Sequence, residues 1–292
     1  MATAQTIERK PRDEELDVYG LTHPGKVRPN NQDHFLICSL HREVVVHSTS
    51  LPLTGALGLG GERLAFLAMV ADGVGGGPKG EEASRVALES VTEYVVQCTR
   101  CYYAADIADT DAFTGALADA AMKCHAVVTE RASVDAAHHG MATTLTMWIG
   151  VWPNAYLLQV GDSRCYAMSD GRLTQLSRDQ TMAQELIDQG ILTRAKAPET
   201  RWSSILSSSI GGRQTEPVIT RIEQRWGNVG LLCSDGLTRH VTDEQIGERL
   251  RTMTSAKQVC EALLQDALDG GGTDNITIIV GRTTEARQQA RE

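Results

Sequence analysis

Four aspartates of this sequence stand beside apolar runs, where a buried strand would bring a carboxylate to the edge of a sheet. Asp72 follows the apolar residues 64–71, whereas Asp162 and Asp235 follow shorter apolar runs in the segments GDSR and CSDG. Asp274 comes shortly before the run ITIIV. A carboxylate that leaves a core needs a basic partner or a metal ion, because an unpaired buried charge is costly.

These carboxylates would meet at one edge if the strand after Asp274 ran antiparallel to its neighbours. Crowded carboxylates repel one another unless a cation neutralises them. Since oxygen ligands suit hard cations, the set favours Mg²⁺ or Mn²⁺ over zinc. The glycines after Asp72, of which Gly73 is the first, would allow the backbone to approach such an ion.

The dipeptide Asp-Gly also has a plainer interpretation, because it is common in ordinary turns. We expect Asp170-Gly171 to close a hairpin and Asp269-Gly270 to end a helix. On spacing alone, a ligand and a turn residue both remain open for Asp72 and Asp235.

Strands and helices must position these acids. Helices are expected over residues 81–102, 111–131 and 181–191, and as a pair over 242–269, mainly from apolar residues at three- and four-residue steps. Blocks of strands and helices without a βαβ repeat favour antiparallel sheets with helices on their outer faces. Strands are expected at residues 16–21, 34–40, 44–47, 64–71, 142–152, 155–160, 164–168, 172–176, 218–223, 229–233 and 276–280.

Composition excludes several classes of protein. The chain has 292 residues and a net charge of −9, which argues against a nucleic-acid partner. No apolar run approaches the roughly 18 residues of a membrane span, and no signal peptide is evident. We therefore expect a soluble cytoplasmic protein without a membrane partner. The seven cysteines indicate reduced core thiols; Cys98 and Cys101 form a CxxC pair, but within a helical pattern.

Six segments in a particular order narrow the choice: NNQD, VADGVGGG, MATTLT, GDSRCY, CSDGL and GGTDNIT. They resemble the metal-dependent Ser/Thr protein phosphatases of type 2C, the PPM family, and in particular its bacterial-type members. The resemblance runs from about Asp17 to Arg282. It implies an α+β fold, a four-layer α/β/β/α sandwich in which two central antiparallel sheets are flanked by helix pairs. A single phosphatase domain would span residues 16–283, between a flexible arm at 1–15 and a charged tail at 284–292.

The resemblance also implies a centre with two Mn²⁺ or Mg²⁺ ions. Asp72 would bridge the two ions, and the carbonyl oxygen of Gly73 would bind one of them. Asp235 and Asp274 would complete the shell of the second ion. Two ions roughly 3.5–4 Å apart lower the pKa of a shared water. The resulting hydroxide would attack phosphorus in line, without a phosphoenzyme.

Three further residues take roles from the resemblance. Asp33 would reach metal-bound water, and Asp162 would hold a third, weaker ion. Arg28 would hold the substrate phosphoryl group, since a guanidinium presents forked and permanently charged donors. Several positions depart from the family: Val74 stands where many members have His, Gln32 where some have Glu, Ala142 where Gly is usual, and Gln180 where His is common.

The expected function is hydrolysis of phosphoserine and phosphothreonine in proteins phosphorylated by Ser/Thr kinases, by a protein that acts as a monomer. We expect the segment 181–216 to be a mobile flap that influences the choice of protein substrate. One alternative is a phosphoprotein-binding module with little turnover, which Val74 and Gln32 favour and the intact Asp72, Asp235 and Asp274 oppose. Another is a phosphatase selective for a phosphorylated anti-sigma-factor antagonist, which would need a sensor domain.

Overall fold

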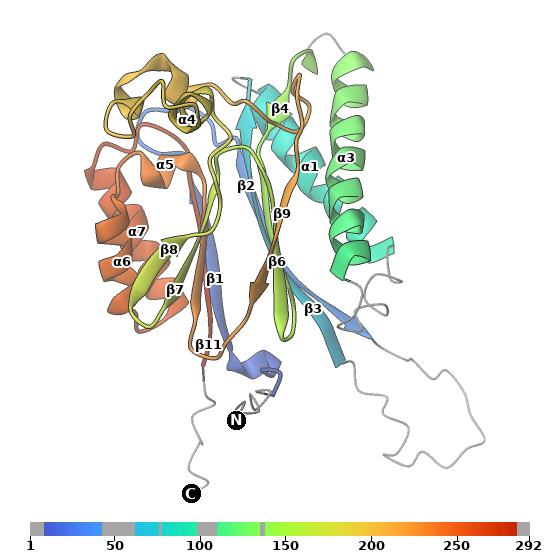
Figure 1. Cartoon of the computed structure of the whole chain (residues 1–292), viewed down its shortest axis with the longest axis vertical. Coiled ribbons are helices and arrows are strands. Elements are labelled where there is room, and N and C mark those ends of the chain that lie inside the picture. The colour runs from blue at the N-terminus through green and yellow to red at the C-terminus, as the bar shows by residue number, and fades with distance from the viewer. Residues whose placement is uncertain (1–8, 43–61, 76–77, 98–109, 135–137, 285–292) are drawn as a thin grey trace, which may run out of the picture.

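Two antiparallel sheets stack face to face in the computed structural model, which describes residues 9–42, 62–75, 78–97, 110–134 and 138–284 (Figure 1). One sheet has the strand order β1 (Leu16–His23), β11 (Ile276–Thr283), β10 (Val229–Cys233), β7 (Arg164–Ser169), β8 (Arg172–Gln175). The other has the order β2 (Asp33–Arg42), β3 (Glu62–Val74), β5 (Leu145–Val151), β6 (Asn154–Val160), β9 (Val218–Glu223), and β4 (Ala142–Thr143) pairs with β3.

Helices cover the outer face of each sheet. Helices α1 (Pro78–Gln97) and α3 (Thr110–Val134) lie against the sheet that contains β3, whereas α6 (Asp243–Arg251) and α7 (Ala256–Asp269) lie against the sheet that contains β11 (Figure 1). The short helices α4 (Met182–Asp188) and α5 (Asp235–Thr238) lie at one end of the sandwich. The predicted four-layer α/β/β/α architecture is therefore confirmed.

The alternating directions of the side chains along β3 explain why this core strand also contributes a residue to the candidate site. Leu67 and Met69 pack toward the helices, whereas Ala68 and Val70 belong to the cluster between the two sheets. Because side chains alternate along a strand, Asp72 falls on the same face as Val70 and points between the sheets. The buried strand thus places a carboxylate at the end of the space between the two sheets.

Near this end of the sheets, β3 and the strand expected over 142–152 differ from their predicted bounds. Strand β3 does not stop before Asp72 but continues to Val74, because Gly73 and Val74 pair with Thr143 and Ala142 of β4. The strand expected over 142–152 is divided at Thr144 into β4 and β5. Asp170 and Gly171 have φ of 51° and 73° between β7 and β8, so the predicted hairpin turn is confirmed.

Residues 9–15, expected to be part of a flexible arm, are instead packed against the domain. Glu15 is buried, and Arg9 donates to it at 2.6 and 2.7 Å. Arg63 forms an ion pair with Asp13. Arg9 also lies over the ring of Trp226, 4.8 Å from its centroid. These ion pairs and the aromatic contact hold a segment that a polar composition alone marks as loose.

Other predictions fall outside the described residues, namely the strand at 44–47 and the pair Cys98 and Cys101. The described cysteines are free thiols, as expected. Within the described residues, no helix is both long and apolar enough to cross a bilayer.

Candidate active site

Five aspartates predicted as metal ligands come from separate elements to the same end of the sandwich. Asp72 lies in β3 and Asp33 begins β2, whereas Asp235 begins α5 immediately after β10. Asp274 precedes β11, which runs antiparallel to both of its neighbours, and Asp162 lies between β6 and β7. Each of the other four carboxylates contributes to raising the pKa of Asp72. The sequence therefore identified residues that the fold does bring together.

Asp33 and Asp72 form the innermost part of the cluster. Asp33 is only 3% exposed, and burial, together with nearby carboxylates, raises its pKa to about 7. Thr277 of the opposite sheet donates its hydroxyl to Asp33 Oδ2 at 2.7 Å, which opposes that rise. Burial and then the charge of Asp33 hold the pKa of Asp72 well above the ordinary carboxyl value. Ionising both groups in this place requires a compensating cation.

Two arginines contact the outer carboxylates. Arg28 Nε lies 2.8 Å from Asp274 Oδ1, and Arg28 Nη2 donates to Asp274 Oδ2 at 2.9 Å. Arg239 Nε donates to Asp235 Oδ2 at 2.9 Å, and Arg239 Nη1 lies 3.7 Å from Asp274 Oδ2. The hydrogen bond to Asp274 raises the pKa of Arg28. Arg28, the predicted phosphoryl-binding residue, therefore lies in the site and is 47% exposed.

Two buried carboxylate oxygens indicate that this site can bind a cation. Asp33 Oδ1 and Asp235 Oδ1 are buried and have no hydrogen-bond partner among the described residues. Orphaned anionic oxygens of this kind fit a hard divalent cation. In the part of the chain that the structure describes, no three acidic, imidazole or thiol groups already form a ready ligand set. The carboxylate oxygens are the kind of ligand that such an ion prefers, and the side chains must move closer together to bind it.

Close backbone contacts determine where these acids stand. A Cβ at Gly73 would overlap the carbonyl of Gly80 and lie 2.7 Å from Gln32 O. A Cβ at Gly236 would overlap the carbonyl oxygen of Asn275. Both glycines are therefore required for the packing of one backbone segment against another, beside Asp72 in one case and Asp235 in the other.

Thr144 and the neighbouring Thr143 explain the break between β4 and β5. The backbone N–H of Asp72 donates to Thr144 Oγ1 at 2.9 Å, and Thr144 N–H donates to Asp72 O at 2.9 Å. Thr143 Oγ1 also donates to Asp72 O at 2.8 Å. These bonds hold the backbone of Asp72, a role that the repeated threonines of MATTLT could have suggested.

Asn275 holds the loop that carries Arg28. Its Oδ1 accepts from Gln32 N–H at 2.8 Å, and its Nδ2 donates to Pro24 O and Asn30 O at 2.9 Å each. The side chain is 4% exposed. Asn275 thus joins both ends of the loop to the strand beside Asp274, a function that sequence reasoning missed.

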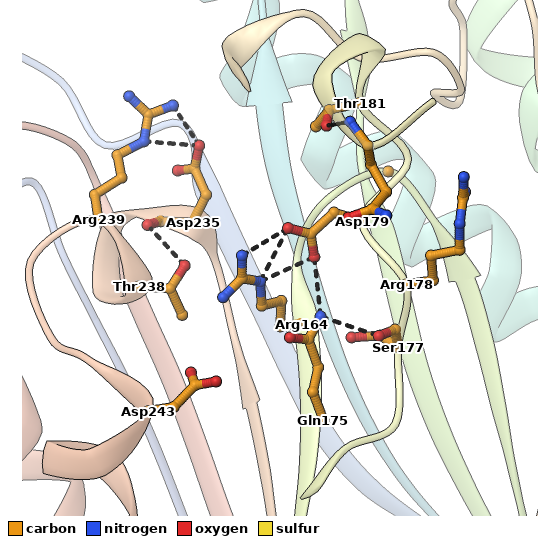
Figure 2. A network of polar contacts seen from close by, with 12 residues as sticks. Arg164, Gln175, Ser177, Arg178, Asp179, Thr181, Asp235, Thr238, Arg239 and Asp243 are labelled. Atoms are coloured by element: carbon orange, nitrogen blue, oxygen red, sulfur yellow. Dashed lines mark hydrogen bonds and ion pairs between the residues drawn. The ribbon is translucent and has the colours of Figure 1, made fainter. Parts of the chain in front are cut away.

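Asp162 opens onto a cavity of about 540 Å³ that it shares with Asp235, Arg239 and residues of the 181–216 segment. Its pKa is held well above the ordinary value, first by burial and then by the charges of Asp235 and Asp179. Asp179 itself is paired with Arg164 at 2.6 Å, whereas Arg239 reaches toward Asp235 (Figure 2). The spacing of Asp235 and Arg239, four residues apart, could have indicated that pair.

The 181–216 segment is partly packed into the domain rather than lying wholly on its surface. Ile210 is fully buried and pairs with Thr143 in a β-bridge. Ser208 and Ser209 are also buried, whereas Arg194 is exposed and lines the cavity. The segment that lines the cavity beside Asp162 is therefore anchored to the core near its C-terminal end, at residues 208–210.

Comparisons of the whole chain with known proteins indicate its family. A model of the family described as Protein phosphatase 2C matches residues 56–270. The Ser/Thr protein phosphatase PstP of Mycobacterium tuberculosis is 34% identical over 219 residues, which cover 74% of this chain and 40% of PstP, so the chain spans less than half of that relative. The Ser/Thr phosphatase stp of Listeria welshimeri is 27% identical over 73% of this chain and 83% of the relative.

A solved structure of the PstP catalytic domain in complex with two manganese ions superposes on this chain with a TM-score of 0.71 at 28% identity. That superposition covers 92% of this chain and 99% of the other. Together with the family match over most of the chain, it leads to one conclusion. The chain belongs to the protein phosphatase 2C family.

Proposed function

We propose that this protein hydrolyses phosphoserine and phosphothreonine in other proteins with the help of two Mn²⁺ or Mg²⁺ ions. The observation that carries the proposal is the pair of orphaned carboxylate oxygens, Asp33 Oδ1 and Asp235 Oδ1, in a cluster of acids beside an exposed guanidinium. Relatives named as Ser/Thr phosphatases and the two manganese ions of the PstP catalytic domain support it.

Asp72, Asp235, Asp274 and the Gly73 carbonyl would hold the ions, with Asp33 behind them. When bound, such ions would supply Lewis acidity that activates water for attack on phosphorus. The acids would then be ionised despite their burial, because the cations offset the cost of the charge. Arg28 would turn from Asp274 to the equatorial phosphoryl oxygens, which its forked donors suit.

The serines near the acids are poor nucleophiles, which favours direct attack by water. Ser234 is fully buried, and its oxygen accepts from Thr277 N–H at 2.9 Å. Ser163 is fully buried as well, and its hydroxyl lies 2.8 Å from that of Thr144. The buried thiols are no better, since burial raises the pKa of Cys124 and Cys260 to about 12.

Val74 marks the main departure from the family pattern. The side chain is 41% exposed at the end of β3 and has no proton to give to a leaving serine oxygen. Water or another group would then protonate that oxygen, so turnover should depend more strongly on the leaving group than in relatives with His at this position.

We also propose that the substrates are phosphorylated by Ser/Thr kinases, that the protein acts as a cytoplasmic monomer in signalling, and that residues 181–216 influence substrate choice. The cavity that joins Asp162 to this segment supports the last point.

The deciding experiment is hydrolysis of p-nitrophenyl phosphate with Mn²⁺, Mg²⁺, Ca²⁺ or EDTA, followed by hydrolysis of phosphoserine peptides. We expect activity with Mn²⁺ or Mg²⁺ that is lost in EDTA and in Asp235→Asn. Asp170→Asn is the matched control, because it changes the Asp of an exposed Asp-Gly turn away from the site. A folded wild type that is inactive with every metal would favour the phosphoprotein-binding module instead.

A further inference from the structure

Arg239 is a cation built into the acidic site. It follows α5 directly, and its guanidinium donates to Asp235 Oδ2 through Nε at 2.9 Å and also through Nη2 (Figure 2). Its Nη1 lies 3.7 Å from Asp274 Oδ2. Burial lowers the pKa of Arg239, but the charge of Asp235, the hydrogen bond to it and the charges of Asp274 and Asp162 together raise it, so the guanidinium stays protonated.

The charge of Arg239 lies in the same cavity as the carboxyl group of Asp162. Asp162, Asp235 and Arg239 line the same cavity of about 540 Å³. Another nearby acid, Asp179, is already neutralised by Arg164, which donates to it at 2.6 and 2.9 Å. Arg164 is therefore committed to Asp179, whereas Arg239 lines the same cavity and, among the described residues, forms its ion pairs with acids of the site, namely Asp235 and Asp274.

Asp235 divides its two oxygens between different partners. Oδ2 accepts from Arg239, whereas Oδ1 is buried and has no hydrogen-bond partner among the described residues. Oδ1 is therefore available to an ion while Arg239 keeps Oδ2. The pair with Arg239 can persist when the two-ion centre is filled.

We propose that the Arg239 guanidinium takes the place of an additional divalent cation between Asp162 and Asp235, so that this chain holds two ions and not three. The inference rests on the proposed two-ion centre and concerns only the cavity beside it. A guanidinium held on a side chain would repel a further divalent ion and cannot exchange with solution. Charge beside Asp162 would then not depend on the concentration of free metal.

The test counts Mn²⁺ ions bound per chain by equilibrium dialysis in the absence of substrate. The wild type is expected to bind two ions even at high free Mn²⁺, and Arg239→Lys, which keeps the charge, should do the same. Arg239→Gln should bind a third, weaker ion, and Arg239→Gln combined with Asp162→Asn should return to two. Arg249→Gln is the matched control, because Arg249 forms a similarly exposed pair with Asp266 outside the site.

Each contrary result has a distinct meaning. A wild type that binds three ions, one of them lost in Asp162→Asn, would overturn the inference and leave the proposed function intact. Two ions in both the wild type and folded Arg239→Gln would overturn it as well. A folded wild type that binds no Mn²⁺ would overturn both the inference and the proposed two-ion centre.

Discussion

Asp33 and Asp72 lie directly opposite each other in the antiparallel register of β2 and β3. Like charges in such cross-strand positions destabilise a sheet. Here the pair also faces the space between two sheets, where Phe35 and Val70 continue the apolar core. The arrangement is stable without a cation only when protons are retained, as the raised pKa values of both groups indicate.

The metal-free protein should therefore lose stability as pH rises. Because the folded pKa of Asp33 is raised to about 7, the folded state keeps a proton that the unfolded chain releases near pH 4. The folded state then binds more protons between these values, so the free energy of unfolding falls with rising pH, by at most roughly 4 kcal/mol for this group. Urea unfolding in EDTA at about pH 5 and about pH 8 measures the effect.

Asp33→Asn supplies the control for this pH dependence, since the amide oxygen can still accept from Thr277 but carries no charge. Its unfolding midpoint should fall less between the two pH values, and Mn²⁺ should reduce the fall in the wild type. Equal slopes for the wild type and Asp33→Asn in EDTA would contradict the prediction.

The sequence alone was sufficient to predict those site residues that are marked by the residues next to them in the chain. Asp72 was found because an apolar run leads into it, and the antiparallel direction of β11 could be inferred as the condition for Asp274 to join the cluster. The four-layer fold followed from the same runs and from the family resemblance. The metal-binding roles of these acids stay predictions.

Contacts between distant segments could not be predicted in this way. Thr144 bonds to Asp72 across 72 positions, and Asn275 bonds to Asn30 across 245. The local pattern does not distinguish Asn275 from an ordinary polar residue at a strand end, and the repeated threonines of MATTLT do not indicate which distant segment Thr144 contacts. The packing of Arg9 against Trp226 was missed for the same reason.

Asn275→Ala should impair both stability and substrate binding. It removes the partner of the buried Gln32 N–H and of the more exposed Pro24 O and Asn30 O, and an unsatisfied buried group costs about 1–3 kcal/mol. We expect a loss of roughly 2–4 kcal/mol in the free energy of unfolding. Since the same bonds hold the loop of Arg28, KM for p-nitrophenyl phosphate should rise more than kcat falls.

The control for this variant is Asn154→Ala, because Asn154 bonds to exposed Arg221 far from the acids. It should change the free energy of unfolding by no more than about 0.5 kcal/mol. Unchanged KM and stability in Asn275→Ala would show that the loop is held by other contacts.

Gly236→Ala should separate Asp235 from the strand that carries Asp274. The new Cβ would overlap the Asn275 carbonyl oxygen, and neither a Cβ fixed to its own backbone nor a backbone carbonyl can rotate away. We expect a loss of about 1–3 kcal/mol, as for other overpacked sites, together with weaker Mn²⁺ binding by calorimetry. Gly115→Ala is the contrasting control in α3, where nothing lies within 4 Å of the added Cβ.

The two glycine variants should change stability in opposite directions. Alanine inside a helix is favoured over glycine by roughly 0.5–1 kcal/mol, so Gly115→Ala should raise the melting temperature slightly. Stabilisation of the protein by Gly236→Ala with full Mn²⁺ affinity would mean that the Asp235 turn is freer to move than its packing indicates.

Residues 192–204 offer a sharper test of substrate choice than removal of the whole 181–216 segment. Removal would take Ile210 out of the core and break its bridge to Thr143, so all activities would fall for a structural reason. Arg194 is exposed and lines the cavity beside Asp162. Its guanidinium can attract acidic residues that flank a phosphoserine.

Arg194→Glu should therefore lower kcat/KM for phosphopeptides with acidic flanking residues by about tenfold, which corresponds to roughly 1.4 kcal/mol. Peptides with neutral flanks, which carry no charge for that side chain to attract, should be hydrolysed at the wild-type rate, and so should p-nitrophenyl phosphate, which has no flanking residues. Arg201→Glu makes the same change of charge in the same segment, but Arg201 stacks on Trp202 and does not line the cavity. If both variants discriminated against acidic peptides equally, the effect would come from net charge rather than from contact with Arg194.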